Sequence, residues 1–313
     1  MMKTSIVFMG TPDFAVPSLE ALHAAGFALP LVVTQPDRPK GRGRTPTPPP
    51  VKVAAQRLGC PTLQPTTVRD AAFVDRLRDL NPDFLVVVAF GHILSRELLA
   101  LPARTAVNLH ASLLPKYRGP APIQWALIRG ETETGVTTML MDTGVDTGDT
   151  LLSAHTPIGP EDTAQTLHHR LARLGAPLLV ETVTRLMRGD LFPRAQKHAD
   201  ATYAPMLCKA DGRIAWEQSA RRIDALIRGV TPWPGAFCFR DDQRLKIIKA
   251  HPLSASAGDA APGTVVAGFP DELRVATGDG CLCIEVIQGA SGKKLSVQDY
   301  LRGHPMPVGT RLQ

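Results

Sequence analysis

The segment VNLHASLLPKYRG, Val107–Gly119, begins in an apolar run that is typical of a buried strand. Pro115 and Gly119 then favour an irregular loop over a helix. Asn108 and His110 are two positions apart, so on a strand both side chains point to the same face of the sheet. The segment therefore predicts two polar side chains held together at the end of a strand.

A second segment, MDTGVDTGD at Met141–Asp149, contributes carboxylates, Asp146 among them. An amide can donate to a developing oxyanion, an imidazole can move a proton, and a carboxylate can orient and charge the imidazole. Together the three groups suffice for acyl transfer to a nitrogen. In the structural alternative, His110 is an ordinary half-buried residue and Asp146 fixes a glycine-rich turn. Spacing alone leaves both interpretations open.

The residues before these segments predict an α/β domain. FLVVVA at Phe84–Ala89 is typical of a strand buried on both faces of a parallel sheet. Ser5–Met9 is a strand candidate that leads through Gly10 into a predicted helix, and Leu31–Thr34 is a second strand. Ligands bind at the carboxyl ends of such strands. Gly10 lacks the other glycines of a dinucleotide-binding fingerprint, and the sequence has no ATP phosphate loop. Binding of NAD or ATP is therefore disfavoured.

The loop Gln35–Pro50 is rich in proline and glycine, which predicts that it forms no regular element. Between Arg38 and Arg69 the chain has seven Lys or Arg residues and no acidic residue. Basic side chains on a loop of this kind can contact phosphates. The alternative is a solvated basic loop without a partner.

Bulk properties indicate an ordinary two-domain protein of 313 residues with a net charge of +6. The sequence has no apolar run long enough to span a membrane. Its five cysteines are scattered, which favours reduced thiols in a cytoplasmic protein. His168 and His169 are adjacent on a predicted helix, where they diverge by about 100° and are poor co-ligands, so we interpret both as surface residues and expect no metal site.

The C-terminal third has a different pattern. A long amphipathic helix, Asp162–Arg188, ends the first predicted domain at residue 189, and residues 190–207 lose periodicity as a linker does. Residues 208–313 predict one helix and a small β-barrel. Its strand candidates are Ile214–Trp216, Ala236–Phe239, Leu245–Ala250, Gly263–Ala267, Leu273–Ala276 and Cys281–Gln288.

VNLHASLLPKYRGPAPIQWAL with the downstream DTGVDTGD resembles the signature of the folate-dependent formyltransferases. The resemblance extends to FMGTPDFA, QPDRPKGRGR, YAPMLCKADGRIAW and TPWPGAF, and so covers nearly the whole chain. It implies a Rossmann-like formyltransferase domain followed by an OB-like β-barrel domain. It also implies that Asn108, His110 and Asp146 are the catalytic residues and that no metal takes part.

By the same resemblance, the co-substrate is 10-formyltetrahydrofolate and the acceptor is an initiator tRNA that carries methionine. The residues implied for folate binding are Phe90, Gly91, Ile93, Ser112, Leu113, Leu114, Pro115, Met141 and Asp142. Those implied for tRNA binding are Arg42 first, with Arg38, Lys40 and Arg44. The C-terminal barrel would bind tRNA as well.

The expected reaction is transfer of the formyl group to the α-amino group of the esterified methionine, by a monomeric enzyme. Other family members that share the three residues differ in acceptor. A sugar-nucleotide N-formyltransferase is the main alternative of this kind, and the barrel argues against the small purine-pathway enzyme. A non-catalytic RNA-binding module, in which the three residues are merely structural, is the alternative from a different class.

Overall fold

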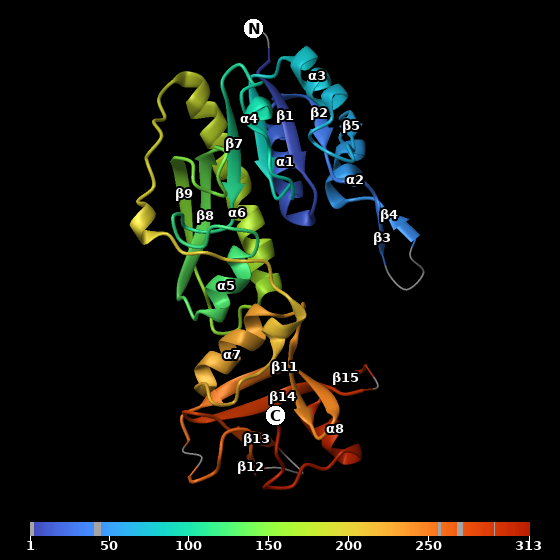
Figure 1. Ribbon diagram of the computed structural model, residues 1–313, viewed down its shortest axis with the longest axis vertical. Helices are drawn as coiled ribbons and strands as arrows, with labels where there is room; N and C mark the ends of the chain where they lie inside the picture. The colour runs from blue at the N-terminus through green and yellow to red at the C-terminus, as the bar shows by residue number, and fades with distance from the viewer. Residues whose placement is uncertain (1–2, 41–44, 256–257, 268–271, 291) are drawn as a thin grey trace. The chain divides into compact units, whose positions relative to one another are not determined.

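The computed structural model describes residues 3–40, 45–255, 258–267, 272–290 and 292–313 (Figure 1). The chain forms two compact units. The first comprises Met1–Pro122, Glu133–Thr156 and His168–Ala204, and the second comprises Ile123–Thr132, Pro157–Leu167 and Pro205–Gln313. None of the described helices combines the length and the apolar composition needed to cross a bilayer.

The first unit contains a seven-stranded sheet with the strand order β5-β2-β1-β6-β7-β8-β9. The pairs from β5 to β7 are parallel, whereas β8 runs antiparallel to β7. This confirms the predicted Rossmann-like domain with its mostly parallel sheet. The strands are β1 Ser5–Gly10, β2 Ala28–Val33, β5 Thr62–Leu63, β6 Phe84–Val88, β7 Thr105–His110, β8 Glu133–Leu140 and β9 Thr150–Pro157.

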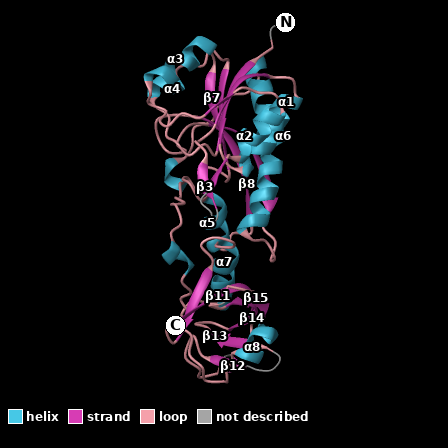
Figure 2. Ribbon diagram, turned by 90° about the vertical axis from the view of Figure 1, so that its right-hand side faces the viewer, coloured by secondary structure: helices cyan, strands magenta, loops and turns pink. Residues whose placement is uncertain are grey.

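Helices cover both faces of this sheet, which is why every residue of β6 is buried. Figure 2 shows α3 and α4 on one face and α1 and α6 on the other. Asp70 begins α3 by accepting a bond from the backbone N–H of Ala72. The helices are α1 Val16–Ala24, α2 Pro50–Arg57, α3 Ala71–Leu80, α4 Arg96–Leu99, α5 Pro122–Ile128 and α6 Ala164–Arg188.

Gly10 ends β1 where the chain turns closely past two neighbours. A Cβ at this position would lie 2.8 Å from the Cβ of Ala15 and 3.0 Å from the carbonyl oxygen of Val88. Both distances are shorter than an ordinary van der Waals contact. The glycine is therefore explained by tight packing of the turn on β6.

The loop Gln35–Pro50 contains a short hairpin, so the prediction that it forms no regular element is wrong. Strand β3, Arg38–Lys40, pairs antiparallel with β4, Thr45–Thr47. Pro39 lies opposite Pro46 in this two-stranded ladder. Proline is tolerated in an edge strand where its missing N–H is not needed for pairing, and composition alone therefore hid the hairpin.

The second unit is built on an antiparallel sheet with the order β10-β11-β14-β13-β12, and β15 pairs with β14. This half-barrel agrees with the predicted OB-like domain and completes the mixed α/β fold class. Its elements are β10 Ala236–Arg240, β11 Gln243–Leu253, β12 Val265–Ala267, β13 Leu273–Ala276, β14 Cys281–Gln288, β15 Lys294–Ser296, α7 Ala220–Gly229 and α8 Val297–Gly303.

The prediction of a strand at Ile214–Trp216 in this unit is wrong. The segment has no strand and runs into a turn. Ile214 and Trp216 are both buried, at 2% and 3% exposure, with an exposed residue between them. The alternation of buried and exposed residues that predicts a strand arises here because two side chains of an irregular segment are buried.

Candidate active site

Asn108 and His110 lie at the carboxyl end of β7, between two neighbouring strands. Asn108 pairs in register with Val87 of β6 and with Met139 of β8. His110 is buried, whereas Asn108 is half-buried. β7 is an interior strand of the sheet. The pair therefore lies where the carboxyl ends of the strands meet, which is where open α/β sheets bind ligands.

Asp146 reaches His110 from the second predicted segment. Its Oδ1 lies 3.5 Å from Nδ1 of His110, and its Oδ2 accepts a 2.8 Å hydrogen bond from the backbone N–H of Gly119. The other ring nitrogen of His110, Nε2, lies 2.9 Å from the carbonyl oxygen of Tyr117. Both ring nitrogens of His110 thus lie near oxygen atoms, and these contacts fix the orientation of the imidazole.

Two residues of this site have left-handed backbone, with φ of 62° at Tyr117 and 54° at Asp146. Such a conformation costs a non-glycine residue about 1–3 kcal/mol and persists where its surroundings fix it. Gly119 has φ of 115°, and a Cβ there would lie 2.7 Å from the carbonyl oxygen of Ala204. Close packing against the backbone of Ala204 therefore restricts the conformation of the loop that follows His110.

Sequence reasoning missed two buried residues that support this loop. Arg118 is 2% exposed and Gln196 is 7% exposed. Nε and Nη2 of Arg118 donate to Oε1 of Gln196 at 3.1 and 2.7 Å. Nε2 of Gln196 donates in turn to the carbonyl oxygens of Asp146 and Gly148, at 2.9 and 2.6 Å. Gln196 lies in the segment predicted as a linker, where no periodicity marks it. Arg118 lies in the motif beside another basic residue, Lys116, and nothing in the sequence singles it out.

The structure brings together two of the segments predicted to bind folate. Phe90 is 2% exposed, and Met141 packs against the same apolar cluster. The carbonyl oxygen of Phe90 accepts bonds from the hydroxyl of Thr11 and from the side-chain amide of Gln35, both at 3.0 Å. These contacts hold the chain after β6 in place. Ile93, by contrast, is 72% exposed.

The remaining predicted folate residues lie in two tightly bonded loops. Ser112 is fully buried, and its hydroxyl donates to the carbonyl of Lys116 at 2.6 Å. The hydroxyl of Thr137 donates to the carbonyl of Ser112 and accepts from the N–H of Leu114, at 2.7 and 3.2 Å. The carboxylate of Asp142 accepts from the hydroxyl of Thr147 at 2.7 Å. The Asp142 side chain thus closes the turn that carries Asp146. Leu113 and Pro115 lie in the first of these loops, whereas Gly91 lies beside Phe90 in the loop after β6.

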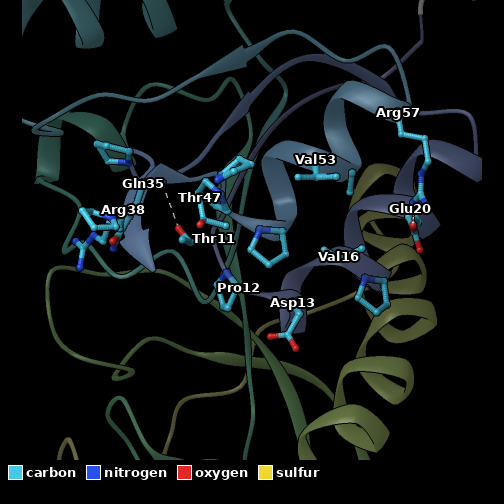
Figure 3. Close-up of a pocket in the computed structure, with 17 residues that line it drawn as sticks. Thr11, Pro12, Asp13, Val16, Glu20, Gln35, Arg38, Thr47, Val53 and Arg57 are labelled. Atoms are coloured by element: carbon cyan, nitrogen blue, oxygen red, sulfur yellow. Dashed lines mark hydrogen bonds and ion pairs between the residues drawn. The ribbon is translucent and has the colours of Figure 1, made fainter. Parts of the chain in front are cut away.

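A cavity of about 740 Å³ lies beside the hairpin, at the ends of β1 and β2 (Figure 3). Proline and aliphatic side chains form most of its wall. Arg38 stands at one end, and the ion pair of Arg57 with Glu20 stands at the other (Figure 3). Other lining residues include Thr11, Pro12, Asp13, Val16, Pro17, Gln35, Pro36, Pro39, Thr47, Pro48, Pro49, Pro50, Val53 and Ala54.

The structure narrows the set of basic residues that are open to an anionic partner. Nζ of Lys52 lies 2.9 Å from Oδ1 of Asp37, just outside the basic run, and Arg57 pairs with Glu20. Hydrogen bonds from Lys52 and Gln64 lower the pKa of Asp37, so its carboxylate stays charged. Of the predicted tRNA contacts, Arg38 is exposed. The side chain of Lys40, and Arg42 and Arg44 entirely, lie outside the described residues.

His168 and His169 lie closer together than predicted. Their ring nitrogens and a carboxylate oxygen of Asp13 all lie within 4.8 Å of one another. Nε2 of His168 is 3.5 Å from Oδ1 of Asp13, and its ring meets the edge of Phe14 at 5.3 Å between centroids. Burial lowers the pKa of His168, Asp13 raises it and His169 lowers it further. His168 is thus half-buried, and the interpretation of it as a surface residue is wrong.

Similarity to known proteins extends over nearly the whole chain. The formyl transferase family model matches residues 2–183, and the model of the formyl transferase C-terminal domain matches residues 206–305. A methionyl-tRNA formyltransferase of Geobacter metallireducens is 51% identical over 312 residues, 100% of this chain and 99% of the relative. One from Citrifermentans bemidjiense is 50% identical over 304 residues, 97% and 95% of the two chains.

Among solved structures, the fold is similar to an N-formyltransferase of Helicobacter canadensis in complex with folinic acid and dTDP-3-aminofucose. The two chains superpose with a TM-score of 0.69 at 19% identity, over 93% of this chain and 100% of that one. That likeness concerns the fold alone. The family model and the full-length identity to curated relatives show that the chain belongs to the formyl transferase family.

Proposed function

We propose that this protein transfers the formyl group of 10-formyltetrahydrofolate to the α-amino group of methionine esterified to initiator tRNA. A bond forms between the amine nitrogen and the formyl carbon, and the bond from that carbon to the folate nitrogen breaks. One proton passes from the amine to the departing folate nitrogen, and nothing is oxidised or reduced. The products are N-formylmethionyl-tRNA and tetrahydrofolate.

The observation that carries the proposal is the pair of buried His110 and half-buried Asp146, 3.5 Å apart, with Asn108 two residues before His110 on β7. We assign to Asn108 the hydrogen bond to the oxyanion that develops on the formyl oxygen. We assign to His110 the movement of the proton. Asp146 holds the ring and balances its positive charge.

We assign the folate site to the loops after β6, β7 and β8. The apolar cluster shared by Phe90 and Met141 supplies a floor on which a flat pterin ring can stack. Backbone groups of these loops and the segment from Ser112 to Pro115 complete the site. The solved neighbour bound to folinic acid shares this fold. We propose no metal in the reaction.

We assign the RNA contact to the hairpin of β3 and β4 with its exposed Arg38, and to Lys40, Arg42 and Arg44. The relatives that are 50% and 51% identical over nearly the whole chain are named for methionyl-tRNA. A hairpin with an exposed arginine suits an RNA partner, because arginine binds phosphate groups. We further assign the chemistry to residues 1–189, the joining segment to 190–207, and a second RNA contact to residues 208–313.

Formyl transfer from 10-formyltetrahydrofolate tests the proposal when three acceptors are compared. These are methionyl initiator tRNA, the same tRNA without an amino acid, and an amino-sugar nucleotide. We expect transfer to the first alone. Transfer to the sugar instead would support the alternative acceptor. Binding of tRNA without transfer to any acceptor would make the protein a non-catalytic RNA-binding module.

A further inference from the structure

The segment that follows α6 docks on the loop between His110 and Gly119, within the first unit. The N–H of Arg118 donates to the carbonyl of Thr202 at 2.9 Å, and the N–H of Ala204 donates to the carbonyl of Arg118 at 2.7 Å. The N–H of Tyr117 donates to the hydroxyl of Thr202 at 2.9 Å. These bonds fix the backbone of Tyr117, whose carbonyl meets the ring of His110.

Gln196 uses the full hydrogen-bonding capacity of its side-chain amide. Its oxygen accepts two bonds from Arg118, and its nitrogen donates two bonds, to the carbonyls of Asp146 and Gly148. An amide has two donor and two acceptor positions, so none remains unused here. Because the group is buried, a change in its position breaks bonds that water does not replace. Gln196 therefore holds the Asp146 backbone in its left-handed conformation.

Arg118 holds Gln196 in turn. Its guanidinium is almost fully buried, and its side-chain partners are the oxygen of Gln196 and, at 3.2 Å from Nη1, Nδ1 of His198, rather than a carboxylate. A buried cation is costly compared with an apolar side chain of similar size. Stability alone thus gives a poor reason for arginine here. Its planar donors do fix the orientation of one amide.

We propose that Arg118 and Gln196 are positioning residues for formyl transfer, which rests on the function proposed above. Arg118 orients the amide of Gln196, and Gln196 holds the turn at Asp146. The carboxylate of Asp146 then meets His110 on one side and the N–H of Gly119 on the other. The chain after α6 thus takes part in the active site through backbone geometry.

In the full-length protein, the variant Gln196→Glu should keep the bonds from Arg118 and lose the bonds to the carbonyls of Asp146 and Gly148. It keeps an oxygen for Arg118 but turns a second oxygen, in place of the N–H donors, toward the carbonyls of Asp146 and Gly148. We expect kcat to fall about 10- to 100-fold, the effect of a misplaced catalytic group. KM for both substrates should stay within about threefold, because Gln196 is buried and presents almost no surface to a substrate.

The control variant Thr182→Val removes a different buried hydrogen bond of the same unit, the 2.8 Å contact between the hydroxyls of Thr182 and Thr138. Thr182→Val should lower Tm by about as much as Gln196→Glu does, and it should leave kcat unchanged. Arg118→Lys keeps the charge but loses the paired donation, so it should lower kcat in the same manner as Gln196→Glu. A fall in Tm with unchanged kcat in Gln196→Glu would give Gln196 a structural role only.

A double-mutant cycle with Asp146→Asn tests whether Gln196 acts through Asp146. In the Asp146→Asn protein, Gln196→Glu should lower kcat by less than about threefold further, because the group it positions is already lost. If the fold-losses in kcat of the two single variants multiply in the double variant, the two residues act independently and the proposal is overturned. Hydrogen exchange of the Gly119 amide, which should be faster in Gln196→Glu, gives a readout that needs no activity. A wild-type protein without formyl transfer would refute the proposed function, whereas unchanged exchange would refute the positioning role.

Discussion

The loop at His110 and the hairpin of β3 and β4 differ in how their polar groups are partnered. At His110, buried groups bond to segments far apart in sequence, as Gln196 does with Asp146. At the hairpin, Arg38 is exposed, and the nearby Lys52 pairs with Asp37 at the surface. Exposed ion pairs contribute about 0–1 kcal/mol, so they are easily exchanged for a new partner. Buried polar groups with fixed partners thus surround the proposed site of proton transfer, whereas exposed charges lie at the proposed RNA contact.

This difference predicts two kinds of mutational effect. Changes at the His110 loop should lower kcat and leave substrate binding intact, because they disturb the transition state. Changes at the hairpin should weaken tRNA binding and its salt dependence and leave kcat nearly unchanged. The predictions below are ordered by the size of the expected effect.

His110→Gln should have the largest effect. We expect kcat to fall about 10²- to 10⁴-fold, the usual contribution of a group that moves a proton. The glutamine can still hydrogen-bond the Tyr117 carbonyl, so folding should be preserved. Steady-state kinetics with methionyl initiator tRNA, beside the thermal unfolding curve, measures both. A loss confined to KM would place His110 in the binding site.

Asn108→Ala should lower kcat by about 10²- to 10³-fold, as expected for loss of one oxyanion donor. The side chain is half-buried at a strand end, so the protein should fold normally. Kinetics at saturating folate and tRNA gives the number. Turnover like that of the wild type would remove Asn108 from the mechanism and weaken the contrast between the two regions.

Arg38→Ala should raise KM for tRNA severalfold and leave kcat nearly unchanged. If Arg38 contacts a phosphate, the slope of log affinity against log salt should become less steep by about one. Arg42→Ala tests the first of the predicted tRNA contacts in the same way. Arg76→Ala, on the exposed face of α3, is the control. An unchanged salt slope in both Arg38→Ala and Arg42→Ala would indicate that the RNA contact lies elsewhere.

The smallest effect concerns the pH dependence of stability. Burial lowers the pKa of His168 below its ordinary value of 6.5. As the pH falls, the unfolded chain therefore binds this proton first, and the free energy of unfolding decreases below about pH 6.5. In His168→Gln, the drop in Tm between about pH 7.5 and about pH 5.5 should be smaller by about 1–3 °C. The exposed His23→Gln should match the wild type, and equal drops in all three would contradict the assignment.

Apolar runs predicted β1, β2, β6 and β7, because strands buried in a parallel sheet require them. The short strand β5 has no such run and was not predicted. The juxtaposition of Asn108 and His110 followed from their spacing on a strand. Gln196 could not be predicted, because its contact with Asp146 joins positions 50 apart and lies in an aperiodic segment. The hairpin was hidden by two prolines that face one another. The closeness of His168 to Asp13 depends on how α6 packs, which no local pattern encodes.

The central claim is that the carboxylate of Asp146 and the ring of His110 act together in formyl transfer to methionyl initiator tRNA. Single-turnover transfer by Asp146→Asn, with both substrates saturating, tests it most directly. The side chain keeps its size and its contact with Gly119 but loses its charge. We predict a rate at least about 100-fold below that of the wild type with tRNA affinity unchanged. A rate within about threefold of the wild type would contradict the claim.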